Sequence, residues 1–198
     1  MNRRLRGNCR FRRTFVFGCA LGAAVAAFAP VLAESAEVGP GELKVVILGK
    51  IAEFMTWPEG SALDTKDRPF ELVVLGETKL AASFDRYFDQ QKATIAGHRV
   101  FLRYAAHPSE VGRPHLLFVG PGFADRLGEI LAAIGDAPTL TAGATAGFAD
   151  RGLAVNLYVA GGRVRFEISQ RALKRQRLRA SYRLLGLANL IDDRQARR

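Results

Sequence analysis

Short runs rich in apolar residues recur through the middle of the chain with helical patterns between them, and this alternation limits the fold more than any other feature. The runs are FELVVLG at 70–76, RVFLRY at 99–104, HLLFVG at 115–120 and PTLTA at 138–142. A continuous apolar run bounded by Gly or Pro is typical of a strand buried on both faces. Apolar residues at helical spacing occupy 80–88 and 123–134. Strands that alternate with helices predict a mostly parallel sheet covered on both faces.

The last part of the sheet is predicted to be an antiparallel hairpin. Two alternating runs in LAVNLYVAGGRVRFEIS (153–169) flank Gly161-Gly162, a two-residue turn signal. This turn pairs Asn156 with Glu167 and Tyr158 with Arg165, and it puts these four polar residues on the outer face. The opposite face is apolar. The fold class is therefore a single-domain three-layer α-β-α sandwich with a mostly parallel sheet and a C-terminal antiparallel hairpin.

Helices are predicted at both ends of the sheet. Pro40 suits a first helical turn, and Trp57-Pro58 ends that segment, whose apolar residues at helical spacing are Leu43, Val46, Ile47 and Phe54. After the hairpin, Ser169 can cap a basic helix at 170–177, and Ser181 can cap a last helix. That last helix would dock inward through Leu184, Leu187, Ala188 and Ile191.

Residues 1–33 have the pattern of an export signal, and residues 34–198 then form one domain. Arginines at positions 3, 4, 6, 10, 12 and 13 precede an uncharged run from Thr14 to Ala33. Val31-Leu32-Ala33 resembles a cleavage site, so the mature chain would begin at Glu34 in the periplasm. Arg12-Arg13 also resembles a twin-arginine motif, which leaves the export route open. An uncleaved membrane anchor is the alternative interpretation.

Removal of the signal changes the charge and the cysteine content. The whole chain has a formal net charge of +10, and the mature chain keeps +4. Residues 34–162 carry −4 and residues 163–198 carry +8, so the basic charge lies at the C-terminal end. The low net charge weakens the case for nucleic acid as a partner. Both cysteines, Cys9 and Cys19, lie in the signal, so the mature chain is expected to have no disulfide or thiol chemistry.

Four local patterns make the chain resemble the YfiR-like family, which is known from periplasmic repressors of membrane-bound diguanylate cyclases. They are KVVILGKIAEFMTWPEG, HLLFVG, TLTAGATAGFADRGLAVNL and RVRFEISQRALKRQRLRASYRLLGLANLI, and they span about Leu43 to Ile191. Pro114 stands where the family often has a cysteine, Leu153 follows Gly152 where it has Gly-Gly, and Ser169 replaces the usual Asn. The resemblance therefore implies the fold and the mode of partner binding, but not redox control.

The candidate partner-binding residues are Trp57, Arg165, Glu167, Arg171 and Arg175. Trp57 either packs over the end of the first helix or anchors an interface. Arg165 and Glu167 are expected to pair on the outer face of the hairpin. The basic run also includes Lys174, Arg177 and Arg179, and it forms either a solvated helix face or a surface that attracts anionic lipid or an acidic receptor.

The chain is not expected to be an enzyme, and no cofactor or metal is expected. Its histidines, His98, His107 and His115, lack a close metal-ligand spacing. The segment 143–147 (GATAG) mimics a nucleophile elbow with Thr in place of Ser, but no acid and base partners can be proposed. No phosphate-binding glycine motif occurs. These observations favour binding over turnover.

Two functions remain. The resemblance implies a periplasmic regulator that binds the periplasmic sensory domain of an inner-membrane diguanylate cyclase and represses cyclic-di-GMP synthesis. The alternative is a periplasmic small-molecule binding module that reports to a transporter, kinase or other membrane receptor. Such a module would use the crevice at the carboxyl ends of the strands, near Gly76, Gly120 and Thr141. A homodimer and a peripheral contact with the membrane surface stay open in either case.

Overall fold

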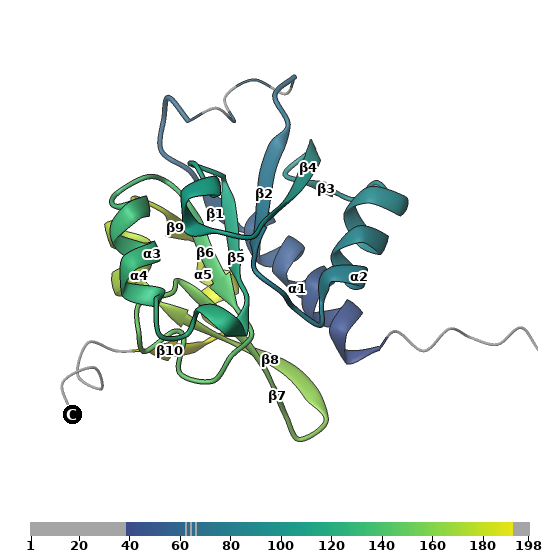
Figure 1. Ribbon diagram of the computed structural model, residues 1–198, viewed down its shortest axis with the longest axis vertical. Coiled ribbons are helices and arrows are strands. Elements are labelled where there is room, and N and C mark those ends of the chain that lie inside the picture. The colour runs from purple at the N-terminus through teal and green to yellow at the C-terminus, as the bar shows by residue number, and fades with distance from the viewer. Residues whose placement is uncertain (1–38, 62, 64, 66, 192–198) are drawn as a thin grey trace, which may run out of the picture. The chain divides into compact units, whose positions relative to one another are not determined.

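An eight-stranded sheet forms the centre of the domain, in the order β10-β8-β7-β6-β5-β2-β4-β3 (Figure 1). The computed structural model describes residues 39–61, 63, 65 and 67–191, so the export signal predicted for 1–33 lies outside the described residues. Neighbouring strands in the middle of the sheet are parallel, as the alternation of strands and helices predicts. These central strands are β2 (Phe70–Leu75), β4 (His98–Ala105), β5 (Leu116–Val119), β6 (Leu140–Gly143) and β7 (Val155–Ala160).

The predicted hairpin and its register are confirmed. Strand β8 (Arg163–Ser169) pairs antiparallel with β7, with Asn156 opposite Glu167 and Tyr158 opposite Arg165. Gly161 and Gly162 have φ values of 58° and 70°, which a two-residue turn between twisted strands requires. The other side of β8 pairs in parallel with β10 (Asn189–Ile191). The hairpin is thus built into the sheet, although its turn extends beyond the neighbouring strands (Figure 1).

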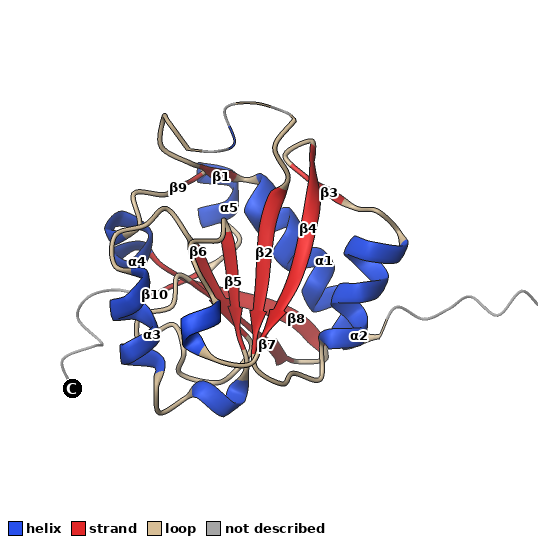
Figure 2. Cartoon of the chain, turned by 45° about the horizontal axis from the view of Figure 1, so that its top comes forward, coloured by secondary structure: helices blue, strands red, loops and turns tan. Residues whose placement is uncertain are grey.

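Helices cover both faces of the sheet, which confirms the three-layer arrangement (Figure 2). Helix α1 (Pro40–Glu53) lies on one face together with α2 (Ala81–Phe84), which continues as a π-helix over Asp85–Gln90. Helix α3 (Leu127–Ile134) lies on the other face. The side chains of β2 alternate between two apolar clusters, with Leu72 and Val74 packing toward α1 and Val73 and Leu75 toward α3. Burial on both faces explains why this strand reads as a continuous apolar run.

Two details of the predicted helices are wrong. Helix α1 buries Val45, Leu48, Ile51 and Ala52, whereas Leu43 and Phe54 of the predicted stripe are exposed, because α1 is packed between the sheet and α2. The last helix, α5 (Tyr182–Leu185), has only four residues, and the chain continues into β10. Leu184 is buried as expected, but Leu187 is 77% exposed.

Several short elements carry no clear signal in the sequence. Strand β3 (Thr94–Ile95) forms an antiparallel hairpin with the start of β4. Strands β1 (Met55–Thr56) and β9 (Arg179–Ala180) form a separate two-stranded sheet. Single 3-10 turns occupy Pro108–Glu110 and Pro121–Phe123. Helix α4 (Gln170–Arg175) begins at Ser169, whose hydroxyl accepts a hydrogen bond from the Ala172 amide, so the predicted cap is confirmed.

Candidate functional site

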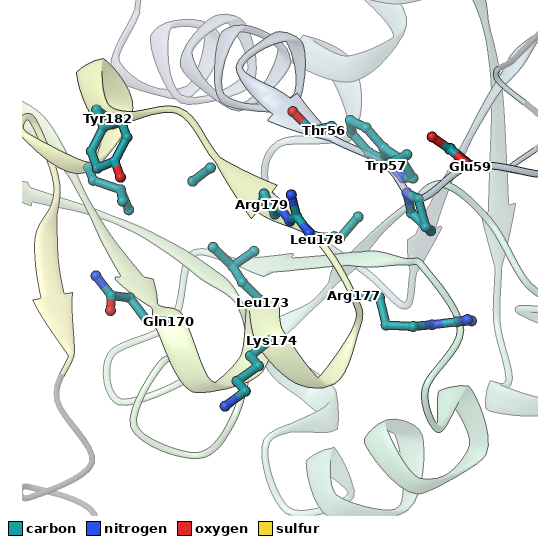
Figure 3. Close-up of a pocket in the computed structure, with 13 residues that line it drawn as sticks. Thr56, Trp57, Glu59, Gln170, Leu173, Lys174, Arg177, Leu178, Arg179 and Tyr182 are labelled. Carbon is teal, nitrogen blue, oxygen red and sulfur yellow. The ribbon is translucent and has the colours of Figure 1, made fainter.

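A groove forms where the segment after α1 meets the segment after α4. Strands β1 and β9 bring these two parts of the chain together by pairing Thr56 with Arg179, and the Ser181 amide donates to the Phe54 carbonyl at 3.0 Å. The groove encloses about 1060 Å³ (Figure 3). It is lined by Thr56, Trp57, Pro58, Glu59, Gln170, Leu173, Lys174, Arg177, Leu178, Arg179, Ala180, Tyr182 and Leu185.

The groove combines an apolar base with basic and aromatic side chains. Leu173 and Leu178 are buried beneath it, and Tyr182 at its edge is 94% exposed. Among the described residues, its charged lining consists of Lys174, Arg177 and Arg179 against one carboxylate, that of Glu59. Arg, Trp and Tyr are the residues that most often dominate binding energy at protein interfaces. This composition suits an anionic or acidic partner that also offers apolar contacts.

Trp57 takes part in both packing and the groove. Its indole Nε1 donates a hydrogen bond to the Pro138 carbonyl at 3.1 Å, and its ring meets Phe70 edge to face with the centroids 5.5 Å apart. The side chain is only half-buried, and its remaining surface lines the groove. The two predicted roles of Trp57 are therefore compatible, since packing fixes the ring in a position where a partner can reach it.

Helix α4 divides the basic run between two sides. Lys174 lines the groove, whereas Arg175 points to the loop after β6 and donates to the Gly152 carbonyl at 3.0 Å. Arg171 and Arg175 do not line the groove. Lys174 and Arg177, which are not among the predicted site residues, therefore share the groove with Trp57, whereas the two predicted arginines of α4 do not.

The outer face of the hairpin is only partly open. Arg165 is exposed, but Glu167 is half-buried and Asn156 is buried. Glu167 does not form an ion pair with Arg165, because its Oε2 instead accepts a hydrogen bond from Asn156 Nδ2 at 3.0 Å. On the far side Glu167 is opposite Asn189 of β10. A partner could thus contact Arg165 directly and the carboxylate of Glu167 from its exposed side.

A buried polar cluster holds α4 against the sheet. Thr141 Oγ1 accepts hydrogen bonds from the Ala154 amide at 3.0 Å and from Gln176 Nε2 at 3.1 Å. Thr141, Asn156 and Gln176 are each at most 1% exposed. Such bonds are strong constraints, because a buried donor without an acceptor costs about 1–3 kcal/mol. The position of the groove wall formed by α4 is therefore fixed from behind.

The chain is closely packed at the glycines where the carboxyl-end crevice was expected. Gly76 has a φ of 77°, and a Cβ atom on it would lie 2.4 Å from the Phe123 ring. A Cβ on Gly120 would lie 2.6 Å from the Glu77 carbonyl oxygen. Thr141 is occupied by the hydrogen bonds of the polar cluster. The open groove lies instead beside β1 and β9, away from these glycines.

The histidines serve backbone contacts in the structure. His98 Nδ1 lies 3.0 Å from the Arg68 carbonyl, and His115 Nδ1 accepts a hydrogen bond from the Glu71 amide at 2.9 Å. Within the described residues, no group of three or more His, Cys, Asp or Glu side chains is arranged to hold a metal ion. Over the same part of the chain, none of the helices has the length and apolar character needed to cross a membrane.

The sequence could not show that Arg179 and Tyr182 join Trp57. Two-residue strands such as β1 and β9 are too short for an alternating pattern, and their pairing joins residues that are more than 120 positions apart. The helical spacing of 170, 173 and 174 does indicate a shared face of α4. That spacing is the signal the sequence offers, but it does not say what the face would contact.

Comparisons with solved structures identify the same general fold. A conserved domain protein from Vibrio cholerae matches with a TM-score of 0.51 and 13% sequence identity. The ABC domain from Streptococcus pneumoniae in complex with L-Trp matches with a TM-score of 0.50 and 8% identity. Each match covers 77% of this chain and 60% of the other. A comparison with curated proteins finds no match.

The family model described as YfiR/HmsC-like matches residues 41–189. This range includes all the lining of the groove, the hairpin and both apolar clusters. Proteins of this family are periplasmic regulators that act with membrane sensor proteins, and the family is not a catalytic one. The protein therefore belongs to the YfiR/HmsC-like family.

Proposed function

We propose that this protein binds the periplasmic sensory domain of an inner-membrane diguanylate cyclase and represses cyclic-di-GMP synthesis. Membership of the YfiR/HmsC-like family supports the general role of a periplasmic regulator. The residues of the groove support contact with an acidic segment of the partner. A repressor of this kind acts by binding the inactive state of the receptor more tightly than the active one, and a preference of a few kcal/mol is sufficient.

The observation that carries this proposal is the meeting of Trp57 with the basic α4–β9 segment in one groove. The side chains of Lys174 and Arg179 are exposed there and make no hydrogen bond or ion pair among the described residues. Their charge is thus available to a partner. Exposed charges of this kind accelerate association and set partner choice. Arg165 is exposed on the hairpin, and we include it and Glu167 in the proposed contact.

The test is repression in cells that carry the cognate membrane cyclase. Deleting the gene for this protein should raise cyclic-di-GMP, and the wild-type gene should restore the low level. A Lys174→Glu/Arg179→Glu variant should fail to restore it, because reversed charges repel an acidic partner. Surface substitutions of this kind change stability by about 0.5 kcal/mol or less, so the variant should fold.

The matched control is Arg99→Glu, which changes an exposed charge on β4, toward the opposite edge of the sheet. It should repress like the wild type. The same level of cyclic-di-GMP with and without this protein would contradict the proposed function. Full repression by the charge-reversed variant would instead contradict the assignment of the groove.

A second function, a small-molecule binding module reporting to a membrane receptor, is supported by the size of the groove. Its volume of about 1060 Å³ is slightly above the range of about 300–1,000 Å³ that is typical of small-molecule sites. Trp57 and Tyr182 could hold an aromatic or apolar group while the basic side chains hold an anionic one. The structurally similar ABC domain was solved in complex with L-Trp, which is compatible with this second function.

Thermal unfolding of the purified protein against a panel of periplasmic metabolites separates the two functions. A ligand that binds only the folded state adds about 2.7 kcal/mol to the free energy of unfolding at a concentration of 100 Kd. The melting temperature rises as a result. Loss of that shift in Trp57→Phe or Arg179→Gln would locate the ligand in the groove. Absence of any specific shift, together with repression in cells, would favour the regulator that acts by protein contact alone.

A further inference from the structure

A second, smaller cavity lies next to the groove, at the end of the sheet where β5 and β6 begin. It encloses about 250 Å³. Its charged or titratable lining residues are Arg113, His115, Asp136 and Arg177. Two arginines and one aspartate thus contribute to this lining, and all three side chains are exposed. The cavity is below the range typical of drug-sized ligands, so its occupant must be a small ion or molecule.

His115 presents a hydrogen-bond donor in this cavity. Its Nδ1 accepts a hydrogen bond from the Glu71 amide at 2.9 Å, and its ring lies 5.2 Å from the ring of Phe70. A neutral imidazole that accepts at Nδ1 carries its proton on Nε2. Burial lowers the pKa of His115 and so favours this neutral form at pH 7. His115 therefore adds an N–H donor without adding a charge.

Arg177 lines both this cavity and the groove. Its backbone has a φ of 56°, a conformation that L-residues seldom adopt, and its Nη2 donates to the Asp136 carbonyl at 3.3 Å. A guanidinium has five N–H donors, so one backbone bond leaves several for a ligand. The Trp57–Pro138 hydrogen bond joins the two linings, because Trp57 faces the groove and Pro138 the cavity. Figure 3 shows Arg177 and Trp57 among the side chains that line the groove.

These groups match the chemistry of a small oxyanion. Guanidinium groups bind phosphate and carboxylate through parallel N–H···O bonds, and a neutral N–H group can donate a hydrogen bond to a further oxygen of the anion. Among the described residues that line the cavity, Asp136 is the one carboxylate against two arginines, which leaves an excess of positive charge. A nucleotide or sugar phosphate is too large for this volume, whereas inorganic phosphate fits with a few water molecules.

We propose that the cavity formed by Arg113, His115 and Arg177 binds a small oxyanion of the phosphate type, and that its occupation weakens the binding of an acidic partner in the groove. The coupling follows because the same guanidinium serves both sites, and an anion on one side neutralises the charge that attracts the partner on the other. The second half of this inference rests on the proposed function. The oxyanion site itself does not.

The direct test is isothermal titration calorimetry, which measures the heat released when sodium phosphate is added to the mature protein at pH 7 and constant ionic strength. We expect saturable binding at one site. Arg113→Gln and Arg177→Asn should each weaken it roughly ten- to a hundredfold, since each removes a charge-assisted anchor. Asn accepts the backbone conformation of Arg177 better than other uncharged polar residues, so that variant should fold. Arg99→Gln, an exposed arginine on β4, is the control and should bind phosphate normally.

A spectroscopic measurement on the wild-type protein gives a second readout that does not depend on any variant. Phosphate in the cavity should raise the pKa of His115 in an NMR titration, because a nearby anion favours the imidazolium form. The charged or titratable groups around the ring are Arg113, Asp136 and Arg177 in the cavity, with Glu71 and His98 beside it. Non-saturable binding, an unchanged His115 pKa, or equal weakening in Arg99→Gln would each overturn the oxyanion site.

Two further experiments identify the source of the oxyanion and test the coupling between the cavity and the groove. Succinate in place of phosphate reports whether a carboxylate suffices, and vesicles of phosphatidylglycerol report whether a lipid phosphate can replace the free ion.

A fluorescein-labelled hexaglutamate peptide serves as the probe of the groove. Phosphate should lower the affinity for this peptide in the wild type but not in Arg113→Gln, with sodium chloride of equal ionic strength as the control. If phosphate binds without changing the affinity for the peptide, the coupling is refuted and the oxyanion site still stands. If the peptide does not bind at all, the assignment of the groove to an acidic partner is contradicted.

Discussion

Substituting Gly76 by alanine tests how tightly the carboxyl end of the sheet is closed. In many sheets of this type that end holds the ligand. Here Gly76 has a φ of 77°, and the Cβ atom of an alanine would lie 2.4 Å from Cε2 and 2.8 Å from Cδ2 of Phe123. Carbon atoms need about 3.5–4.0 Å for a favourable contact, so the ring must move.

The cost has two parts that a control variant separates. Alanine in the left-handed backbone region costs roughly 1–2 kcal/mol by itself. Overpacking adds about 1–3 kcal/mol, which gives about 2–5 kcal/mol for Gly76→Ala. Gly97 has a similar φ of 82°, but no atom lies within 4 Å of the place where its Cβ would stand, so Gly97→Ala should show only the backbone cost.

Thermal unfolding of the two variants measures the difference. For a domain of this size, each kcal/mol shifts the melting temperature by about 2–4 °C, so Gly76→Ala should melt roughly 4–20 °C below the wild type. Measured in a Phe123→Leu background, its cost should fall toward that of Gly97→Ala. Equal melting temperatures for Gly76→Ala and Gly97→Ala would refute the reasoning. They would mean that the Phe123 ring moves freely and that the crevice can open for a ligand.

Three further predictions concern the supports of the two cavities. Thr141→Val should lower the free energy of unfolding by about 2–4 kcal/mol in urea titrations, because it leaves the Gln176 amide and a backbone N–H buried without an acceptor; an effect below that of an ordinary surface change would contradict it. Burial lowers the pKa of His115, so its contribution to stability is present above pH 6.5 and declines as the pH falls below that value. Urea unfolding at pH 7.5 and pH 5.5 should show a larger acid loss in the wild type than in His115→Asn, and equal losses would exclude this histidine as the cause. Arg175→Met should cost about 0.5–1.5 kcal/mol through its lost bond to a backbone carbonyl, whereas Lys174→Met should be close to neutral; the reverse order in chemical denaturation would show that the division of α4 is wrong.

Features that depend on neighbours in the sequence were predictable. The alternation of apolar and polar residues around Gly161-Gly162 specifies the hairpin together with its register, because a shift by one residue would expose the whole apolar face. Continuous apolar runs such as 70–76 identify strands buried on both faces for the same local reason. Ser169 identifies the start of α4, since an N-cap satisfies backbone groups within one turn.

Features that depend on contacts between distant segments were not predictable. Helix α1 has apolar residues on more than one side, and only its position between the sheet and α2 decides that Val45 and Leu48 are buried while Leu43 is exposed. The segment after Ser181 has the spacing of a helix, yet the free edge of β8 draws it into β10 after one turn. Pairing with an open strand edge satisfies backbone groups that a local pattern cannot foresee.

The candidate site divides along the same line. By itself the sequence determined that a tryptophan follows the first helix, that a basic segment follows the hairpin and that polar residues share the outer face of β7 and β8. Only the tertiary structure decided that Trp57 and Arg179 line one groove beside a two-residue strand pair, that Arg175 turns away from the groove and that Phe123 packs against Gly76 at the carboxyl end of the sheet. The physical reason is that periodicity and capping act over a few residues, whereas a groove is defined by the packing of segments whose separation along the chain leaves no local signal.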